Sequence, residues 1–200
     1  VAVHPPCGAG RDAVLTLNDA LPHVVGIDTG LTCTGGATAG RVVRTVRIGQ
    51  AGVTKLPLME RVETITDLGR AVLDWMYLTP DESLPRYPKA WRRPDLVVME
   101  APDTSNAYGG LVERIQLFHE IARALVEMRV PLAVVPPAVL KGYATGNGGH
   151  QGGKKRIIAA VNELWPEYGK VNDDEADAAV LAAMGLDKLT GLRRVSDAQS

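Results

Sequence analysis

Two acidic residues each close an apolar run of the sequence. Residues 23–28 read His-Val-Val-Gly-Ile-Asp and residues 96–100 read Leu-Val-Val-Met-Glu, so the runs end on Asp28 and Glu100. Short apolar runs of this kind are typical of buried β-strands. Because strands of one sheet end side by side, we expect the two carboxylates to be neighbours. They would repel each other unless a cation lay between them.

A second acidic pair lies at the start of a predicted helix later in the chain. Asp174 and Asp177 are three residues apart, so both side chains project from one face of that helix. The helix also carries an apolar stripe that can pack on the sheet, formed by Ala178, Val180, Leu181 and Met184. Such packing would bring its first turn to the strand ends. Four carboxylates would then converge as a hard-ligand set suited to Mg²⁺ or Mn²⁺.

The chemistry that fits such a set is two-metal-ion hydrolysis of a phosphodiester. Two ions about 4 Å apart can stabilise both the attacking and the leaving oxygen, and no protein nucleophile is needed. None of the four histidines accompanies an obvious serine or cysteine motif for a covalent route. Simpler roles stay open for single residues, because acids in a first helical turn complement the helix dipole and an aspartate before Thr-Gly suits a turn. Taken together and in this order, the acids favour a metal site.

A mixed α/β sheet has to position these carboxylates. After the strand at 23–28, two further strands are expected near 33–38 and 41–48, and strands this close in sequence can only pair antiparallel. The remaining expected elements are a helix at 58–78, a strand at 96–100, a helix at 108–128, a strand at 131–135, a short helix from Pro137, and helices near 154–163 and 174–189. This order predicts three antiparallel strands followed by two parallel ones, flanked by helices.

The composition is that of one domain with a sizeable core. The chain has 200 residues, 46% of them apolar, and a formal net charge of −1. We expect an irregular arm over residues 1–21, one domain over 22–190 and a tail over 191–200. No apolar stretch is long enough to predict a membrane span, and residues 1–10 lack the pattern of a signal peptide. The two cysteines cannot form a disulfide framework, which favours a reducing cytoplasm.

Positive charge gathers in a stretch without acidic residues. Between Glu127 and Glu163 the charged residues are all cations, namely Arg129, Lys141, Lys154, Lys155 and Arg156. The glycine-rich loop at 144–153 would let the backbone approach a phosphate closely. The cations that open the next helix oppose its dipole, which favours an anion beside them. The stretch therefore predicts phosphate contacts, with an ordinary solvated loop as the alternative.

A second basic segment, residues 86–93, interleaves four cations with two aromatic side chains. This pattern suits stacking on a nucleobase together with phosphate contacts. Trp91 could equally anchor a surface loop to the core, so both interpretations stay open.

Four segments of the chain resemble the motifs of the RuvC family of Holliday-junction resolvases. Residues 26–35 (Gly-Ile-Asp-Thr-Gly-Leu-Thr-Cys-Thr-Gly) are similar to the family's opening strand and turn, and residues 97–100 to its second catalytic strand. Residues 141–148, followed by Lys154, resemble its lysine and Thr-Gly-x-Gly segment, and residues 174–179 its final acidic helix. The motifs stand in family order and span nearly the whole predicted domain, and the ordered set is more specific than any one motif.

The resemblance implies an RNase H-like fold, a homodimer, and paired nicks across a four-way DNA junction in a bacterial or phage-infected bacterial cell. It also implies that two Mg²⁺ or Mn²⁺ ions are held by Asp28, Glu100, Asp174 and Asp177. The residues expected to contact DNA are Lys141, Lys154, Lys155, Arg156 and Tyr108.

The sequence also departs from the family pattern. Thr29 stands where the family usually has proline, and the spacing from Gly148 to Lys154 is longer. Tyr108 is the candidate substitute for the phenylalanine that follows the family's catalytic glutamate and helps part the junction bases. These differences favour a broader range of branched DNA, including forks and flaps.

Other classes of protein compete with this hypothesis. An actin-like ATP-binding protein or a small-metabolite kinase also opens with strand, aspartate, glycine and Thr-Gly, but it needs a second Asp-x-Gly loop and a longer, two-lobed chain. A non-catalytic RNase H-fold DNA-binding module would leave the complete acidic set without a purpose. A related nuclease that acts on RNA or R-loops is a closer alternative, since the sequence carries no signal for or against the 2′-OH.

Overall fold

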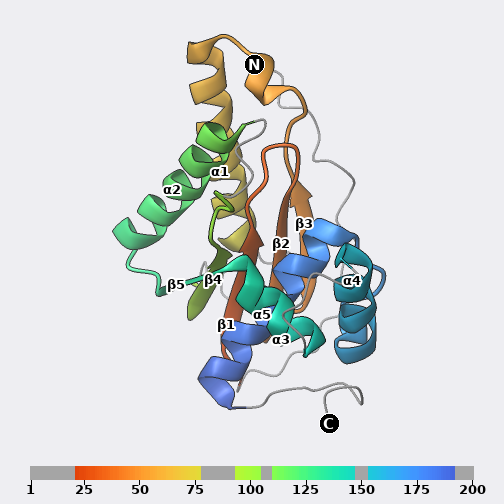
Figure 1. Cartoon of the computed structure of the whole chain (residues 1–200). Helices are drawn as coiled ribbons and strands as arrows, with labels where there is room; N and C mark the ends of the chain where they lie inside the picture. Colours follow the sequence, from red (N-terminus) through yellow and green to blue (C-terminus); the bar gives the residue numbers. More distant parts are fainter. Residues whose placement is uncertain (1–20, 78–92, 105–109, 147–152, 192–200) are drawn as a thin grey trace.

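The computed structural model describes residues 21–77, 93–104, 110–146 and 153–191, which surround one five-stranded sheet (Figure 1). In the spatial order β3-β2-β1-β4-β5, its strands are β1 (His23–Asp28), β2 (Thr34–Gly40), β3 (Arg44–Ile48), β4 (Leu96–Glu100) and β5 (Leu132–Val135). β2 pairs antiparallel with β1 and β3, whereas β4 pairs parallel with β1 and β5. The predicted α/β fold with an RNase H-like mixed sheet is confirmed.

Helices cover both faces of the sheet. α1 (Leu58–Tyr77) and α2 (Leu111–Glu127) lie over one face, and α3 (Pro137–Thr145), α4 (Gly153–Leu164) and α5 (Asp173–Thr190) lie over the other (Figure 1). The sequence pattern does not foresee two short 3-10 turns, η1 (Val53–Lys55) and η2 (Pro166–Tyr168). None of the described helices has the length and apolar character needed to cross a membrane.

Several expected features fall outside the described residues. The arm over 1–21 and the tail over 191–200 each contribute one described residue, and the basic segment 86–93 contributes only Arg93. Tyr108 and most of the glycine-rich loop at 144–153 are also outside.

The turn between β2 and β3 lies later in the chain than residues 39–40, where strands at 33–38 and 41–48 would place it. β2 continues to Gly40 and β3 starts at Arg44, so residues 41–43 form the connection. The hydroxyl of Thr38 donates to the carbonyl oxygen of Val42 (2.9 Å) and accepts from the backbone N–H of Arg44 (3.1 Å). A side-chain hydrogen bond of this kind fixes a turn, but it cannot be predicted from the alternation of apolar and polar residues.

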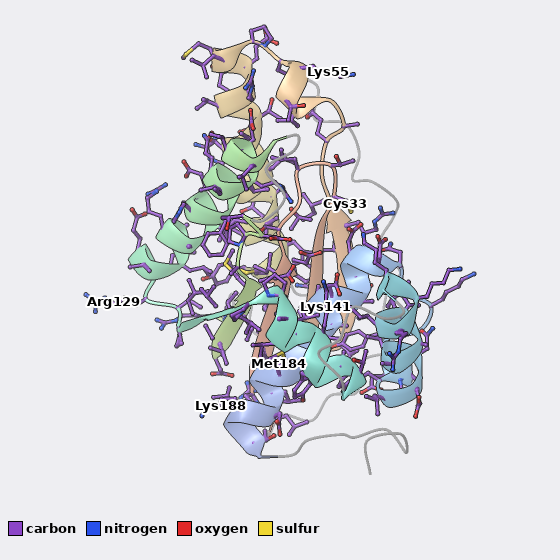
Figure 2. The ribbon with its side chains drawn as sticks, in the orientation of Figure 1. Cys33, Lys55, Arg129, Lys141, Met184 and Lys188 are labelled. Atoms are coloured by element: carbon purple, nitrogen blue, oxygen red, sulfur yellow. The ribbon has the colours of Figure 1, made fainter. Side chains whose placement is uncertain are left out.

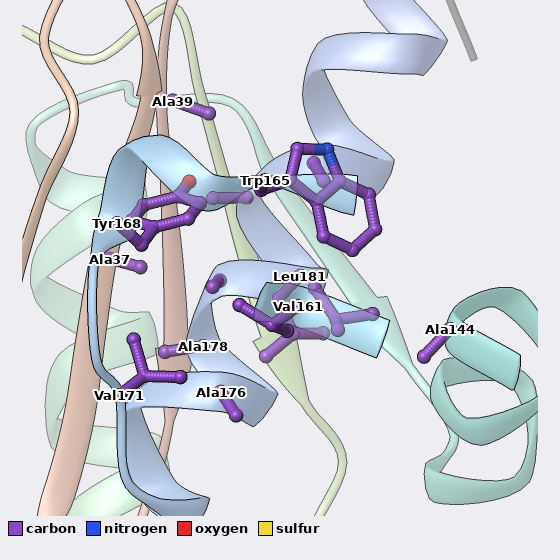
Figure 3. Close-up of a cluster of buried hydrophobic side chains, with 14 of the residues drawn as sticks. Ala37, Ala39, Ala144, Val161, Trp165, Tyr168, Val171, Ala176, Ala178 and Leu181 are labelled. Atoms are coloured by element: carbon purple, nitrogen blue, oxygen red, sulfur yellow. The ribbon is translucent and has the colours of Figure 1, made fainter. Parts of the chain in front are cut away.

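Alternate side chains of the strands enter two separate cores. Val25 and Ile27 of β1 belong to the core under α1 and α2, whereas Val24 belongs to the core under α5. In the second core, Val161 and Trp165 pack with α5 (Figure 3). Helix α5 is therefore covered by the sheet on one side and by α4 on another, which explains why the middle of α5 is almost continuously apolar.

Helix α5 lies unusually close to the strands because glycines face it. An added Cβ at Gly26 of β1 would lie 2.1 Å from the carbonyl oxygen of Ala178, and one at Gly35 of β2 would lie 2.0 Å from that of Asp174. Two fully buried alanines of the helix, Ala178 and Ala182, lie at the Gly26 contact. Backbone-to-backbone packing thus fixes both the height and the axial position of α5.

A capping box fixes where α5 begins. The side chain of Asn172 accepts from the backbone N–H of Glu175, and the Glu175 carboxylate accepts from the backbone N–H of Asn172, both at 3.1 Å. The hydroxyl of Thr45 on β3 donates to the same carboxylate at 2.9 Å. The first turn of α5 is therefore tied to the sheet as well as capped.

Gly26→Ala should destabilise the protein, because its Cβ would overlap helix backbone that can move only if α5 shifts as a whole. We expect a loss of about 1–3 kcal/mol or more in the free energy of unfolding, measured by chemical denaturation. Gly69→Ala in α1 is the matched control, since its nearest non-local atom would lie 3.6 Å away. Alanine should be neutral or stabilising there by up to about 1 kcal/mol. Equal stability of the two variants would contradict the close-packing account.

Candidate metal centre

The ends of β1 and β4 bring Asp28 beside Glu100. The parallel register pairs Ile27 with Met99, so the next position on each strand carries one of the two carboxyl groups. A side-chain hydrogen bond joins the two carboxyl groups. Both side chains are half-buried, so the pair lies at the edge of the core rather than in open solvent.

Helix α5 brings the second acidic pair to the same place. Gly35 is the cross-strand partner of Asp28, and its Cα faces the carbonyl of Asp174 so closely that no side chain would fit between them. The negative charge of Asp174 acts on Asp28, and that of Asp177 acts on Glu100. The structure thus brings together all four carboxylates that the sequence analysis singled out.

Burial, reinforced by neighbouring negative charges, raises the pKa of three carboxyl groups in the cluster. Burial raises the pKa of the Asp28 carboxyl well above its usual range, and the charges of Glu100 and Asp174 raise it further. Burial also raises the pKa of Glu100. Burial, together with the charge of Asp28, raises the pKa of Asp177 to about 7. Each shift means that the ionised form is disfavoured, so a positive charge placed among these oxygens would stabilise the cluster.

Two lysines supply part of that positive charge. Lys141 of α3, labelled in Figure 2, lowers the pKa of both Glu100 and Asp177 by its charge, against the larger effect of burial. Lys154 of α4 acts on Asp28 and Asp177 in the same sense. Its ammonium also pairs with Asp173, which lowers the pKa of that carboxyl.

The other expected DNA-contacting residues lie differently. Lys155 and Arg156 are exposed in the first turn of α4. Neither is among the charges that most affect the carboxylates, unlike Lys154 beside them. Tyr108 lies outside the described residues.

An arginine that no sequence motif indicates lies against the cluster. Arg47 of β3 approaches Asp174 at 3.4 Å between Nη2 and Oδ2, and its Nε donates to the Sγ of Cys33 at 3.0 Å. Burial raises the pKa of this thiol to about 12, so Cys33 stays protonated. β3 has the spacing of an ordinary edge strand, and only its pairing with β2 reveals that Arg47 lies opposite Gly35 and hence under Asp174.

The donor chemistry of the cluster fits a divalent cation. All the candidate ligands are carboxylate oxygens, as Mg²⁺ and Mn²⁺ prefer. Oδ1 of Asp177 is buried and has no hydrogen-bond partner among the described residues, which is costly for a carboxylate unless a cation satisfies it. Within the described ranges, no three Asp, Glu, His or Cys side chains are grouped tightly enough to hold one ion. The cluster therefore supplies suitable ligands without a finished coordination shell.

Comparison with known proteins identifies the architecture. No protein-family model and no curated protein sequence matches the chain. Among solved structures, RuvC of Thermus thermophilus matches with a TM-score of 0.59 and 18% sequence identity, over 86% of this chain and 99% of that one. The chain has the fold of RuvC.

Two further structures are similar. Thermus thermophilus RuvC in complex with a Holliday junction substrate matches with a TM-score of 0.55 and 19% identity, over 87% of this chain and 99% of that one. The yeast mitochondrial Holliday junction resolvase Ydc2 matches with a TM-score of 0.46 and 16% identity, over 82% of this chain and 80% of that one. At such low identity, the RuvC matches establish the fold alone.

The charge balance of the cluster makes a prediction about metal-free stability. In EDTA at pH 8, Asp28→Asn should raise the melting temperature. The Asp28 carboxyl has a higher pKa in the folded protein than in the unfolded chain, so above the unfolded pKa it destabilises the fold, and asparagine removes this effect. A gain of a few degrees is expected, since 1 kcal/mol moves the midpoint of a chain of this size by about 2–4 °C. Differential scanning calorimetry measures it.

Adding Mn²⁺ should reverse that order. With Mn²⁺ at one hundred times its dissociation constant, the wild type should gain about 2.7 kcal/mol of stability, and its melting temperature should rise accordingly. The melting temperature of Asp28→Asn should change little. Asp173→Asn is the matched control: it removes a neighbouring acid whose pKa is lowered by Lys154, so it should lose stability in EDTA and keep most of the Mn²⁺ response. A Mn²⁺ response that survives in Asp28→Asn would argue against Asp28 as a ligand.

Proposed function

We propose that this protein is a metal-dependent, structure-selective endodeoxyribonuclease that nicks four-way DNA junctions and other branched DNA such as forks and flaps. The observation that carries the proposal is the meeting of Asp28, Glu100 and α5's acids at one edge of the sheet. The RuvC fold supports it, because one of the matched structures is a RuvC bound to a Holliday junction substrate.

Each carboxylate has a role in the proposal. Asp28 and Glu100 would hold cations from the strand ends, and Asp174 and Asp177 would hold them from the helix. Two bound Mg²⁺ or Mn²⁺ ions would supply stabilisation of the attacking and leaving oxygens of the phosphodiester. The Oδ1 of Asp177 is the oxygen most in need of a positive partner, because it is buried without a hydrogen bond among the described residues.

The basic residues would hold the DNA backbone near the carboxylates. Lys141 and Lys154 act electrostatically on the cluster, so they would also lie near a phosphate bound there. Lys155 and Arg156 are exposed on the first turn of α4 and would extend the contact along the strand. Tyr108 would stack on a junction base, as the sequence resemblance implies.

A homodimer in the bacterial cytoplasm completes the proposal. Two copies would carry the two active sites needed for paired nicks on opposing strands. Val112 and Val126 of α2 are 74% and 67% exposed, which supplies an apolar surface for such a contact.

Cleavage of labelled four-way junctions, forks, flaps and linear duplex in Mg²⁺, Mn²⁺ or EDTA tests the function. The wild type should nick branched DNA in either metal and be inactive in EDTA. Asp28→Asn should lower the rate at least about a hundredfold while junction binding, measured by electrophoretic mobility, persists, because the substitution removes a metal ligand and leaves the basic residues intact.

Asp187→Asn is the matched control for that variant, because Asp187 belongs to the last turns of α5 and takes no part in the cluster. It should cut like the wild type. Undiminished cutting by Asp28→Asn, or equal activity in EDTA, would overturn the metal mechanism.

A further inference from the structure

A polar groove opens directly beside the carboxylate cluster. Its volume is about 630 Å³, and the first residues of α5, Asp173 and Asp174, form one wall. The turn at 30–33 between β1 and β2 forms another part, together with Gln50 and Thr54 from the segment after β3. The groove and the cluster therefore share Asp174 as a common boundary.

Two arginines line this groove from opposite elements. Arg47 comes from β3, where its guanidinium pairs with Asp174, and Arg114 comes from the first turns of α2. The two acids in the lining already have cationic partners, since Asp173 pairs with Lys154. Both acids of the groove are therefore paired with cations, and Arg114 adds a positive charge beyond these pairs.

That further charge, on Arg114, lacks a partner in the described part of the chain. Its Nε is buried and makes no hydrogen bond there, and none of the ion pairs found among these residues includes it. The neighbouring acid on α2, Glu113, is taken by Arg61 at 2.6 Å. A half-buried guanidinium without an anion is unfavourable, and its planar fork matches the oxygens of a phosphate.

We propose that the groove is a phosphate subsite, in which Arg114 binds a backbone phosphate of the DNA strand that runs into the carboxylate cluster. The inference rests on the proposed function and deepens it, since it assigns the DNA strand a path through the groove between Arg114 of α2, Arg47 of β3 and the start of α5. Thr32, Gln50 and Thr54 add neutral hydrogen-bonding side chains to the same lining. Because Asp174 borders both places, the bound phosphate is a near neighbour of the one that is cut.

Arg114 is a positioning residue in this account, and its removal has a distinctive signature. Arg114→Ala should weaken binding of a four-way junction in Ca²⁺ about tenfold at 150 mM salt, as expected for loss of one charge-assisted hydrogen-bonding contact. The slope of log affinity against log salt should fall by about 0.9, the value for one phosphate contact. Arg114→Lys should restore the slope but only part of the affinity, because an ammonium keeps the charge and loses the fork.

Arg70→Ala is the matched control, because Arg70 is an exposed arginine on α1 that pairs with Asp67. It should change neither affinity nor slope. Melting temperatures of all variants, recorded alongside, separate a loss of folding from a loss of binding.

A substrate series makes the test independent of how the variants fold. Single methylphosphonates, which remove the charge of one phosphate, are placed at successive positions on either side of the cleaved bond. For the wild type, one position within a few nucleotides of that bond should weaken binding about tenfold. In Arg114→Ala the same substitution should have little further effect, because the two changes remove one contact.

The outcomes separate this inference from the function on which it rests. If the wild type cuts junctions in a metal-dependent way but Arg114→Ala matches Arg70→Ala, or no methylphosphonate position is sensitive to Arg114, the subsite is wrong and the nuclease stands. If the wild type neither binds nor cuts branched DNA, both fall together.

Discussion

The contact between the backbone of α5 and two glycines of the sheet sets the position of the helix that carries half of the acidic cluster. Gly26 and Gly35 leave no space for a side chain between strand and helix, so the helix has one possible height over β1 and β2. The capping box and the bond from Thr45 then fix its rotation and its first residue. A helix held in this way presents Asp174 and Asp177 to the strand ends within narrow limits.

The electrostatic interactions among the acidic residues oppose this packing. The fold buries carboxylates at one edge of the sheet, and this burial, together with the neighbouring negative charges, raises the pKa of Asp28 and Asp177. The surrounding cations come from three separate elements, with Arg47 on β3, Lys141 on α3 and Lys154 on α4. Stability is thus traded for a site with a strong affinity for positive charge, an arrangement common where proteins bind metals.

Much of the fold and the core of the candidate site could be predicted from the sequence. The positions of Asp28 and Glu100 could be predicted because an apolar run indicates a buried strand and neighbouring strands of a sheet end side by side. The ion pair of Arg47 with Asp174 was not, because it joins residues 127 positions apart and depends on the register of β3. Arg114 likewise looks like any polar residue of an amphipathic helix until the groove beside it is known.

The bond between Thr45 and Glu175 spans 130 positions of the chain. A contact this distant in sequence closes a long loop, and the entropy of that closure slows its formation. On the ribosome, the strands and their two acids emerge long before α5 does. A polypeptide that ends before α5 therefore holds only half of the acidic cluster, and the cluster is complete only once α5 has docked on the sheet.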